Sequence, residues 1–240
     1  MQCLILAGGL GTRMQGVTTT LPKAMIDVSG RPFVDHQLAD LASQGIDDVV
    51  IAIGHLGQSI RDFVGDGSRW GLSVQCVEDG QALLGTAGSI RNAIELGLMG
   101  AGFFVLYGDS YLTVDFQQVW SAADNGRSPL MTVFRNDGQW DHSNVVMGGE
   151  HITLFEKGRA DAHEIGMAYI DYGLSVMTRD AITRFVTRGE TADLASVCHR
   201  LSLQRKLRAF EVFERFYEIG SPQGLADLEA HLRIKGKIND

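Results

Sequence analysis

The chain has 240 residues, of which 45% are hydrophobic and 21% charged, with 29 glycines and a formal net charge of −8. That charge argues against a general nucleic-acid or anionic-membrane binder, because such proteins carry a cationic face, but a small anionic ligand needs only a local positive pocket. Cys3, Cys76 and Cys198 form no C-x-x-C pair, so we expect three reduced thiols in the cytoplasm and neither a disulfide framework nor a cysteine-based zinc site.

In the first half of the chain, short β-rich runs alternate with helical patterns. Strands are predicted at residues 3–7, 49–53, 72–77 and 103–107, and helices at residues 33–43, 60–64 and 87–96. Alternation of this kind implies parallel strands joined by crossover helices. The expected fold is α/β, with a doubly wound, Rossmann-like sheet that is mixed but mostly parallel and is flanked by helices.

The second half is richer in predicted strands. They fall at residues 130–134, 145–147, 152–155, 168–177 and 207–213, and helices are predicted at 115–123, 179–186, 192–203 and from Ser221 onward. Ser221 and Pro222 are a typical N-cap and first helical residue. The composition shows no linker, so we expect a single domain over residues 1–240, whose second half extends the sheet and forms a lid over its carboxyl edge.

A glycine-rich loop, GGLGTR at residues 8–13, directly follows the first predicted strand. Its glycines expose backbone N–H groups and let the chain approach a ligand closely, and Arg13 adds a positive fork that suits phosphate oxygens. A dinucleotide fingerprint would need a third glycine where Met14 stands. A Walker A loop would need lysine where Val17 stands. The loop therefore indicates phosphate binding without either of those two motifs.

Five further segments follow in order: PK at residues 22–23, GTAG at 85–88, GD at 108–109, EK at 156–157 and EIG at 218–220. Together with the glycine loop they span most of the chain, and the whole set resembles the sugar-1-phosphate nucleotidylyltransferase family. Within that family the chain is most similar to guanylyltransferases that act on D-glycero-D-manno-heptose 1-phosphate or mannose 1-phosphate.

The resemblance implies attack of a sugar 1-phosphate oxygen on the α-phosphorus of an NTP, with release of pyrophosphate. The nucleophile is already anionic, so catalysis reduces to in-line positioning and charge neutralisation. The catalytic residues implied are Arg13, Lys23 and Asp109, and the nucleotide-binding residues are Leu6, Ala7, Gly8, Gly9, Gly11, Thr12, Arg13, Gly85, Thr86 and Ala87. Asp109 and Glu218 would bind Mg²⁺, because oxygen-only ligands suit that ion.

For the sugar phosphate, the resemblance implies a β-rich sugar-binding lid with Asn144, Glu156, Lys157, Asp171 and Gly173. Asn144 stands where glycine is common, and Asp171 stands where asparagine often precedes the glycine. A carboxylate at Asp171 accepts hydroxyl donors only, which favours a polyhydroxylated sugar. Glu218 replaces the more common aspartate, so the geometry of the metal site must shift.

The partners implied are an NTP, with GTP favoured, and a sugar 1-phosphate, with heptose or mannose 1-phosphate favoured, for surface polysaccharide or glycan precursors. We expect no nucleic-acid or membrane partner and a cytoplasmic location, and the sequence leaves a homo-oligomer open. A UTP- or CTP-dependent transferase for another sugar phosphate or phosphocholine is the alternative within the fold. A non-catalytic nucleotide-binding regulatory subunit is the alternative from a different class.

Overall fold

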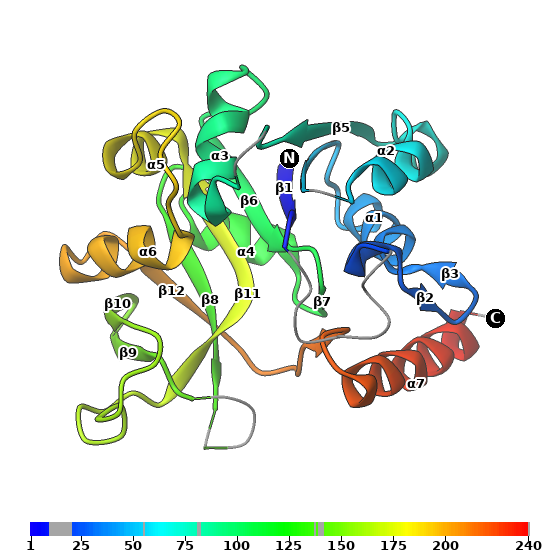
Figure 1. Ribbon diagram of the computed structural model, residues 1–240. Coiled ribbons are helices and arrows are strands. Elements are labelled where there is room, and N and C mark those ends of the chain that lie inside the picture. The colour runs from blue at the N-terminus through cyan, green and yellow to red at the C-terminus, as the bar shows by residue number, and fades with distance from the viewer. Residues whose placement is uncertain (10–20, 55, 81–82, 137, 139–141, 240) are drawn as a thin grey trace.

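The computed structural model describes residues 1–9, 21–54, 56–80, 83–136, 138 and 142–239. Within these residues the chain builds a nine-stranded sheet in the order β5-β4-β1-β6-β11-β8-β12-β10-β9 (Figure 1). The loop from residue 10 to residue 20, which contains Gly11, Thr12 and Arg13, lies outside the described residues.

The first half of the chain supplies four neighbouring parallel strands. These are β5 (Ser73–Glu78), β4 (Asp48–Ile53), β1 (Gln2–Ala7) and β6 (Gly102–Tyr107). Each lies within one residue of its predicted bounds, because continuous apolar runs flanked by polar turns are a strong strand signal. Since the four strands are parallel, their carboxyl ends lie along the same edge of the sheet.

The second half extends the same sheet, as predicted. Its strands are β11 (Tyr169–Thr178), β8 (Leu130–Arg135), β12 (Arg208–Val212), β10 (His151–Phe155) and β9 (Val145–Gly148). β11 runs antiparallel to both of its main neighbours, β6 and β8, and β10 runs antiparallel to β12 and β9, whereas β12 is parallel to β8. The sheet is therefore mixed, with seven of its nine strands pointing the same way.

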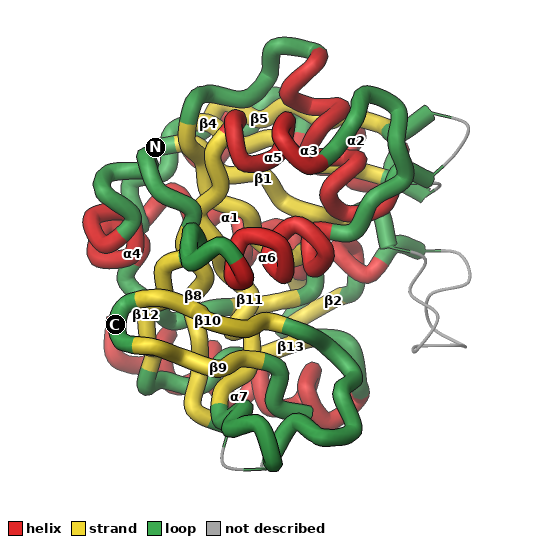
Figure 2. Tube along the Cα trace, turned by 90° about the vertical axis from the view of Figure 1, so that its left-hand side faces the viewer, coloured by secondary structure: helices red, strands yellow, loops and turns green. Residues whose placement is uncertain are grey.

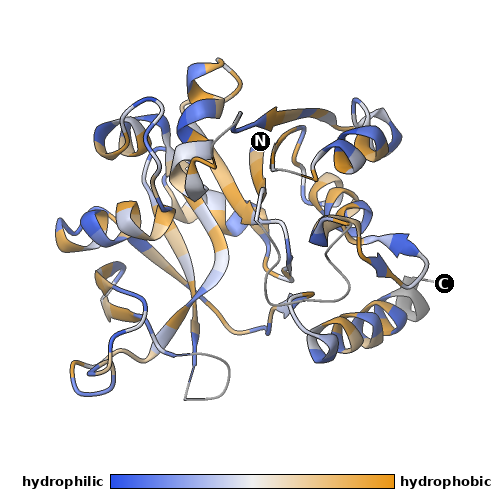
Figure 3. Cartoon of the chain, viewed as in Figure 1, coloured by the Kyte–Doolittle hydropathy of each residue, from blue (hydrophilic) through white to orange (hydrophobic). Residues whose placement is uncertain are grey.

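Helices cover both faces of the sheet. α1 (Phe33–Ser43), α2 (Gln58–Val64) and α4 (Phe116–Ala122) share one buried cluster with the strands, and α3 (Gly85–Glu95), α5 (Arg179–Phe185) and α6 (Leu194–Leu203) share the other. α6 contacts the outlying strand β10 (Figure 2). Residues of high hydropathy are concentrated along the strands (Figure 3), and the buried apolar residues of the helices belong to the same two clusters. This is the doubly wound arrangement that the alternating pattern predicts.

Three of these helices begin with a side-chain cap. Asp115 accepts a hydrogen bond from the Gln118 N–H, Thr178 from the Ala181 N–H and Asp193 from the Ala195 N–H. Such caps satisfy backbone donors that have no partner within the helix. Asp193 also matters for the candidate site, because it ties α6 to α3.

Two small two-stranded sheets lie outside the nine-stranded sheet. β2 (Asp27–Val28) pairs with β3 (Arg31–Pro32), and β7 (Ser110–Tyr111) pairs with β13 (Tyr217–Glu218). The last helix, α7 (Pro222–Asn239), packs with β13 and β2 over a third apolar cluster. None of these two-residue strands was predicted, because they are too short to show a period. Among the described residues, no helix has both the length and the apolar character needed to cross a membrane.

Candidate active site

A cavity of about 450 Å³ lies at the carboxyl ends of β1 and β6, and we call it the glycine-loop cavity. Six of the residues predicted to bind nucleotide line it, namely Leu6, Ala7, Gly8, Gly9, Gly85 and Thr86. Ala87 is fully buried beside it, and its N–H donates to the Ala192 carbonyl over 2.9 Å. The position after the strands is where a doubly wound sheet binds ligands.

The two strands that form the cavity floor approach each other too closely for a side chain at Gly108. A β-carbon at this position would lie 2.8 Å from the Leu6 carbonyl oxygen and 3.0 Å from the Ala7 Cα. The Gly108 N–H also donates to that carbonyl over 3.0 Å. Gly108 therefore fixes the end of β6 against the end of β1, immediately before Asp109.

The GTAG segment is held against the loop that precedes α6. Gly85 has a φ of +73°, and a β-carbon there would lie 2.6 Å from the Ala192 carbonyl oxygen. The Thr86 hydroxyl donates to Asp193 over 3.0 Å and accepts the Leu194 N–H over 2.7 Å. The glycine permits a backbone conformation and a close contact that other residues disfavour, and the threonine links two helices. This wall of the cavity is therefore rigidly anchored.

Asp79 and Ser89 also line the glycine-loop cavity, and the sequence analysis missed both. The Asp79 carboxylate accepts the Leu84 N–H over 3.0 Å and the Ser89 hydroxyl over 2.8 Å. Asp79 follows β5 and precedes Gly80, so in sequence it resembles an ordinary turn residue. Only the parallel order of the strands brings it to the same edge as Gly8 and Asp109.

A second cavity, of about 720 Å³, adjoins the first, and we call it the Asp171 cavity. Lys23, Tyr107 and Asp109 line both cavities. The Lys23 Nζ lies 2.8 Å from the Asp109 Oδ2, and their side chains are 19% and 36% exposed. Two of the three residues predicted to be catalytic, Lys23 and Asp109, are thus brought together at the boundary between the cavities, and the third, Arg13, lies outside the described residues.

Glu218 lies in the Asp171 cavity, next to this ion pair. β13 pairs with β7, and the Ile219 N–H donates to the Asp109 carbonyl over 3.0 Å. A β-carbon at Gly220 would lie 3.6 Å from the Glu218 Oε2 and 3.7 Å from the Lys23 Nζ. The backbone pairing therefore brings Glu218 beside Asp109, although the two are far apart in sequence.

The donor set at this boundary fits a magnesium ion. Asp109 and Glu218 offer carboxylate oxygens, which are the ligands Mg²⁺ prefers, and bound phosphates would complete its coordination. The described residues contain no group of three or more histidine, cysteine, aspartate or glutamate side chains that could hold a metal by themselves. Cys3, Cys76 and Cys198 are free thiols. The arrangement thus suits an ion shared with substrates rather than a protein-only metal site.

Four of the five residues predicted to bind the sugar phosphate line the Asp171 cavity: Asn144, Lys157, Asp171 and Gly173. The Asn144 side-chain oxygen accepts the Asp171 N–H over 3.1 Å, and Asp171 accepts the Gly173 N–H over 3.0 Å. Gly173 has a φ of +108°, and the pairing of β11 with β8 shifts register between Asp171 and Ser175. At this irregularity in β11, the Asp171 side chain bends back toward its own strand, where its carboxylate accepts the backbone N–H of Gly173.

Glu156 lies outside that lining. Its carboxylate forms an ion pair with Arg159 over 2.8 Å, and Arg159 also binds Asp161. The Glu156 N–H donates to the Asn144 carbonyl over 2.9 Å, so its backbone supports the cavity wall. Its predicted role as an acceptor for sugar hydroxyls stays a prediction.

Asp171 is a buried carboxylate with the Lys157 ammonium group nearby. Its side chain is 8% exposed, and the Lys157 Nζ lies 3.9 Å from its Oδ2. Burial raises the pKa of the Asp171 carboxyl above its ordinary value, and Lys157 offsets part of that rise. A carboxyl with a higher pKa in the folded state stabilises the fold at low pH, and this contribution is lost as the pH rises through the folded-state pKa.

Replacing Asp171 with asparagine is therefore expected to raise the melting temperature at pH 7–8, because it removes a buried negative charge but keeps the oxygen that accepts the Gly173 N–H. The gain should shrink as the pH falls and the wild-type carboxyl becomes protonated. Thermal melts of both proteins between pH 4 and pH 8 test this. Asp62→Asn, on the exposed face of α2, is the matched control and should show no such trend. A gain in melting temperature that does not change with pH would contradict the raised pKa of Asp171 as its cause.

The fold and its two adjoining cavities define a class of protein, an α/β protein of Rossmann-like architecture with two cavities that meet at the carboxyl ends of its parallel strands. Residues 2–186 match the family described as nucleotidyl transferase, and the chain belongs to that family. The family resemblance that the six sequence motifs indicated is thereby confirmed.

Several relatives and solved structures are similar to this chain. N-acetylmuramate alpha-1-phosphate uridylyltransferase of Neisseria meningitidis serogroup B is 37% identical over 125 residues, which cover 52% of this chain and 54% of that protein. Probable mannose-1-phosphate guanylyltransferase 3 of Oryza sativa is 27% identical over 93% of this chain and 62% of its own length. The aligned region therefore spans only about half to three fifths of these two relatives.

The crystal structure of HddC from Yersinia pseudotuberculosis complexed with GMP-PN superposes with a TM-score of 0.76 at 23% identity, covering 96% of this chain and 99% of that chain. A glucose-1-phosphate thymidylyltransferase of Streptomyces antibioticus is 32% identical over 70% of this chain and 48% of its own length. The solved structure shares the fold. The names of these proteins include guanylyl, uridylyl and thymidylyl transferases, so the similarities do not select one base.

Proposed function

We propose that this protein is a sugar-1-phosphate nucleotidylyltransferase that joins GTP to heptose 1-phosphate or mannose 1-phosphate and releases pyrophosphate. One observation carries the proposal: the Lys23–Asp109 ion pair lies where the glycine-loop cavity and the Asp171 cavity meet. A reaction between two polyanions needs adjoining sites with charged groups between them. The nine-stranded sheet spans both halves of the chain, which supports one functional domain.

In this proposal, Gly8, Gly9 and the GTAG wall bind the nucleotide, and Arg13 binds its phosphates. Lys23 leaves Asp109 to contact the phosphates, and Lys157 contacts the phosphate of the sugar 1-phosphate. Mg²⁺, held by Asp109 and Glu218, would neutralise charge on both substrates and orient them in line. No general base is required, because the attacking phosphate oxygen already carries a negative charge.

The direct test is a substrate panel. The protein is incubated with Mg²⁺, with ATP, CTP, GTP, UTP or dTTP, and with one of a set of sugar 1-phosphates. The set includes D-glycero-D-manno-heptose 1-phosphate, mannose 1-phosphate, glucose 1-phosphate and N-acetylmuramate 1-phosphate, and pyrophosphate release is measured for each pair. We expect the highest kcat/KM for GTP with the heptose or mannose substrate. Preference for UTP or dTTP would overturn the base assignment but keep the reaction.

The same panel separates the enzyme from a non-catalytic nucleotide-binding subunit. That alternative predicts a rise in melting temperature with an NTP but no pyrophosphate from any pair, because ligand binding stabilises the folded state without chemistry. Turnover with at least one pair excludes it. An EDTA-treated sample should lose turnover and regain it when Mg²⁺ is added, whereas full activity without a divalent ion would contradict the role given to Asp109 and Glu218.

A further inference from the structure

A third cavity, of about 620 Å³, lies at the edge of the sheet opposite the candidate active site, and we call it the far-edge groove. β11 joins the two regions, with Asp171 near its start and Thr178, which lines the groove, at its end. At about 3.3 Å per residue in a strand, these two residues are about 23 Å apart. A ligand in the far-edge groove would therefore be separate from both substrates.

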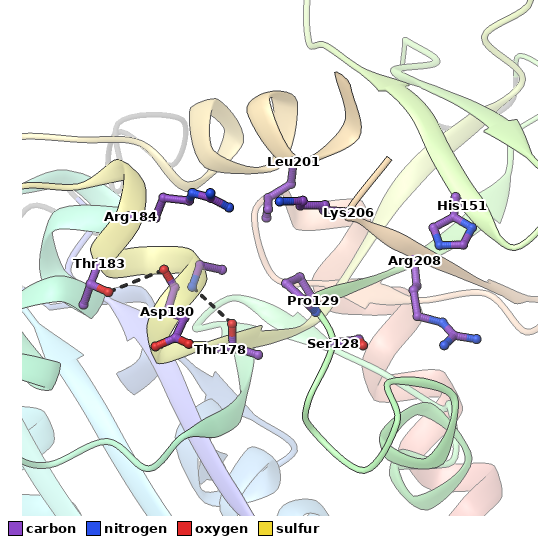
Figure 4. A pocket seen from close by; sticks show the side chains of 11 residues that line it. Ser128, Pro129, His151, Thr178, Asp180, Thr183, Arg184, Leu201, Lys206 and Arg208 are labelled. Atoms are coloured by element: carbon purple, nitrogen blue, oxygen red, sulfur yellow. Dashed lines mark hydrogen bonds between the residues drawn. The ribbon is translucent and has the colours of Figure 1, made fainter. Parts of the chain in front are cut away.

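Positive groups dominate the lining of this groove. Arg184, Lys206 and Arg208 contribute to it, and Asp180 is the one acidic residue in the lining. Within the described residues, no carboxylate forms an ion pair with Arg184 or Lys206. Figure 4 shows the charged ends of these two side chains pointing toward one another across the groove. This convergence stands out in a chain with 29 acidic and 21 basic residues.

The backbone explains how the charges are tolerated. Arg184 lies in the last turn of α5, and Lys206 lies in the loop that follows α6, where its N–H donates to the Leu201 carbonyl over 2.9 Å. Helix C-termini favour nearby cations, because their free carbonyl groups carry partial negative charge. The two positive groups therefore need no acidic side chain to hold them, and their charge stays available to a ligand.

The rest of the lining suits an organic molecule rather than a bare ion. Pro129 provides apolar surface among the charged side chains, and the mostly buried Leu201 and Ala181 complete the lining. Arg208 is bound to Glu150 over 3.1 Å, and that glutamate side chain is 79% exposed. An exposed pair of this kind is weak, so a multivalent anion competes for the guanidinium at low cost. Arg208 thus provides a third cation at the rim.

We propose that the far-edge groove binds a small organic molecule that carries a phosphate group. The phosphate lies between Arg184 and Lys206, and the carbon part of the ligand lies against Pro129. The site is independent of the reaction proposed above, since it shares no lining residue with either of the other two cavities.

The test is a titration of ¹⁵N-labelled protein with inorganic phosphate and with phenyl phosphate, at an ionic strength held constant with KCl. We expect saturable shifts of the amide signals of Thr183, Arg184, Lys206 and Arg208. Phenyl phosphate should bind several times more tightly than inorganic phosphate, because its ring buries apolar surface. The double variant Arg184→Gln/Lys206→Gln should raise the Kd for phenyl phosphate at least tenfold.

The matched control is Arg188→Gln/Arg233→Gln, which removes the same charge from two exposed arginines outside the groove. It should leave the Kd within about twofold of the wild-type value. The proposal is overturned if the shifts occur only around Gly8, Lys23 and Lys157, if they grow linearly without saturation, or if both double variants weaken binding equally. The wild-type titration does not depend on turnover, so its outcome is separate from that of the substrate panel.

Discussion

The variant Asp109→Ala is expected to lower kcat about a thousandfold and to change the melting temperature little. Asp109 is one of the three residues that line both cavities, and its carboxylate forms an ion pair with Lys23. Removing the carboxylate would remove the proposed metal ligand and would break the ion pair with Lys23. Loss of one preorganised electrostatic contact to the transition state costs about 10²–10³ in kcat, and loss of a bound ion costs at least as much.

The effect on folding should be small, because the carboxylate is partly exposed and solvent screens its ion pair. Asp62→Ala on α2 is the control, since it removes the same chemical group from an exposed helix face. The measurements are kcat from pyrophosphate release and the melting temperature of each variant. Wild-type kcat in Asp109→Ala would contradict the placement of Asp109 in the active site. A largely unfolded Asp109→Ala protein would show that Asp109 has a structural rather than a catalytic role.

The variant Gly108→Ala is expected to impair both stability and activity, although it adds only one methyl group. The new β-carbon would lie 2.8 Å from the Leu6 carbonyl oxygen and 3.0 Å from the Ala7 Cα, so backbone atoms must move. Overpacking of this kind costs about 1–3 kcal/mol. Since Asp109 follows directly, a shift of about 1 Å there should lower kcat/KM about a hundredfold.

Gly100→Ala is the matched control, because its β-carbon would lie 3.4 Å from the Gln2 side-chain oxygen, which is ordinary contact. Chemical denaturation and kcat/KM should distinguish the two variants. We expect Gly100→Ala to differ from the wild type by less than about 0.5 kcal/mol in its free energy of unfolding. Equal effects at the two glycines would mean that the close approach of β1 and β6 does not set the position of Asp109.

The sequence predicted the main elements of the sheet well, for a physical reason. Residues 49–53 are buried within the sheet, so β4 is apolar from Val49 to its end and gives a clear strand signal. α1 has its apolar positions at helical spacing and was predicted with its observed bounds. β7 and β13 were not predictable, because a two-residue strand has no period and exists only through its partner.

The residues of the candidate site that belong to a sequence motif were predictable. The residues that stand alone in the sequence were not. Lys23 and Asp109 were found through the dipeptides around them, and the structure brings them within 2.8 Å. Asp79 and Ser89 belong to no motif, and only the strand order places them at the cavity. The pairing of Glu156 with Arg159 depends on side-chain geometry, which sequence spacing alone does not determine.

The position of β12 in the sheet has a consequence for how the chain is made. β12 lies between β8 and β10, yet both neighbours are synthesised well before it. A growing chain that has reached only α5 therefore has the edge of β8 unpaired, and an open edge of this kind is prone to pair with other chains. The sheet becomes continuous only after synthesis has passed Val212. Glu218 can lie beside Asp109 only after it too has been synthesised. Newly made molecules consequently depend on residues 208–218 both to cover the edge of β8 and to bring Glu218 beside Asp109.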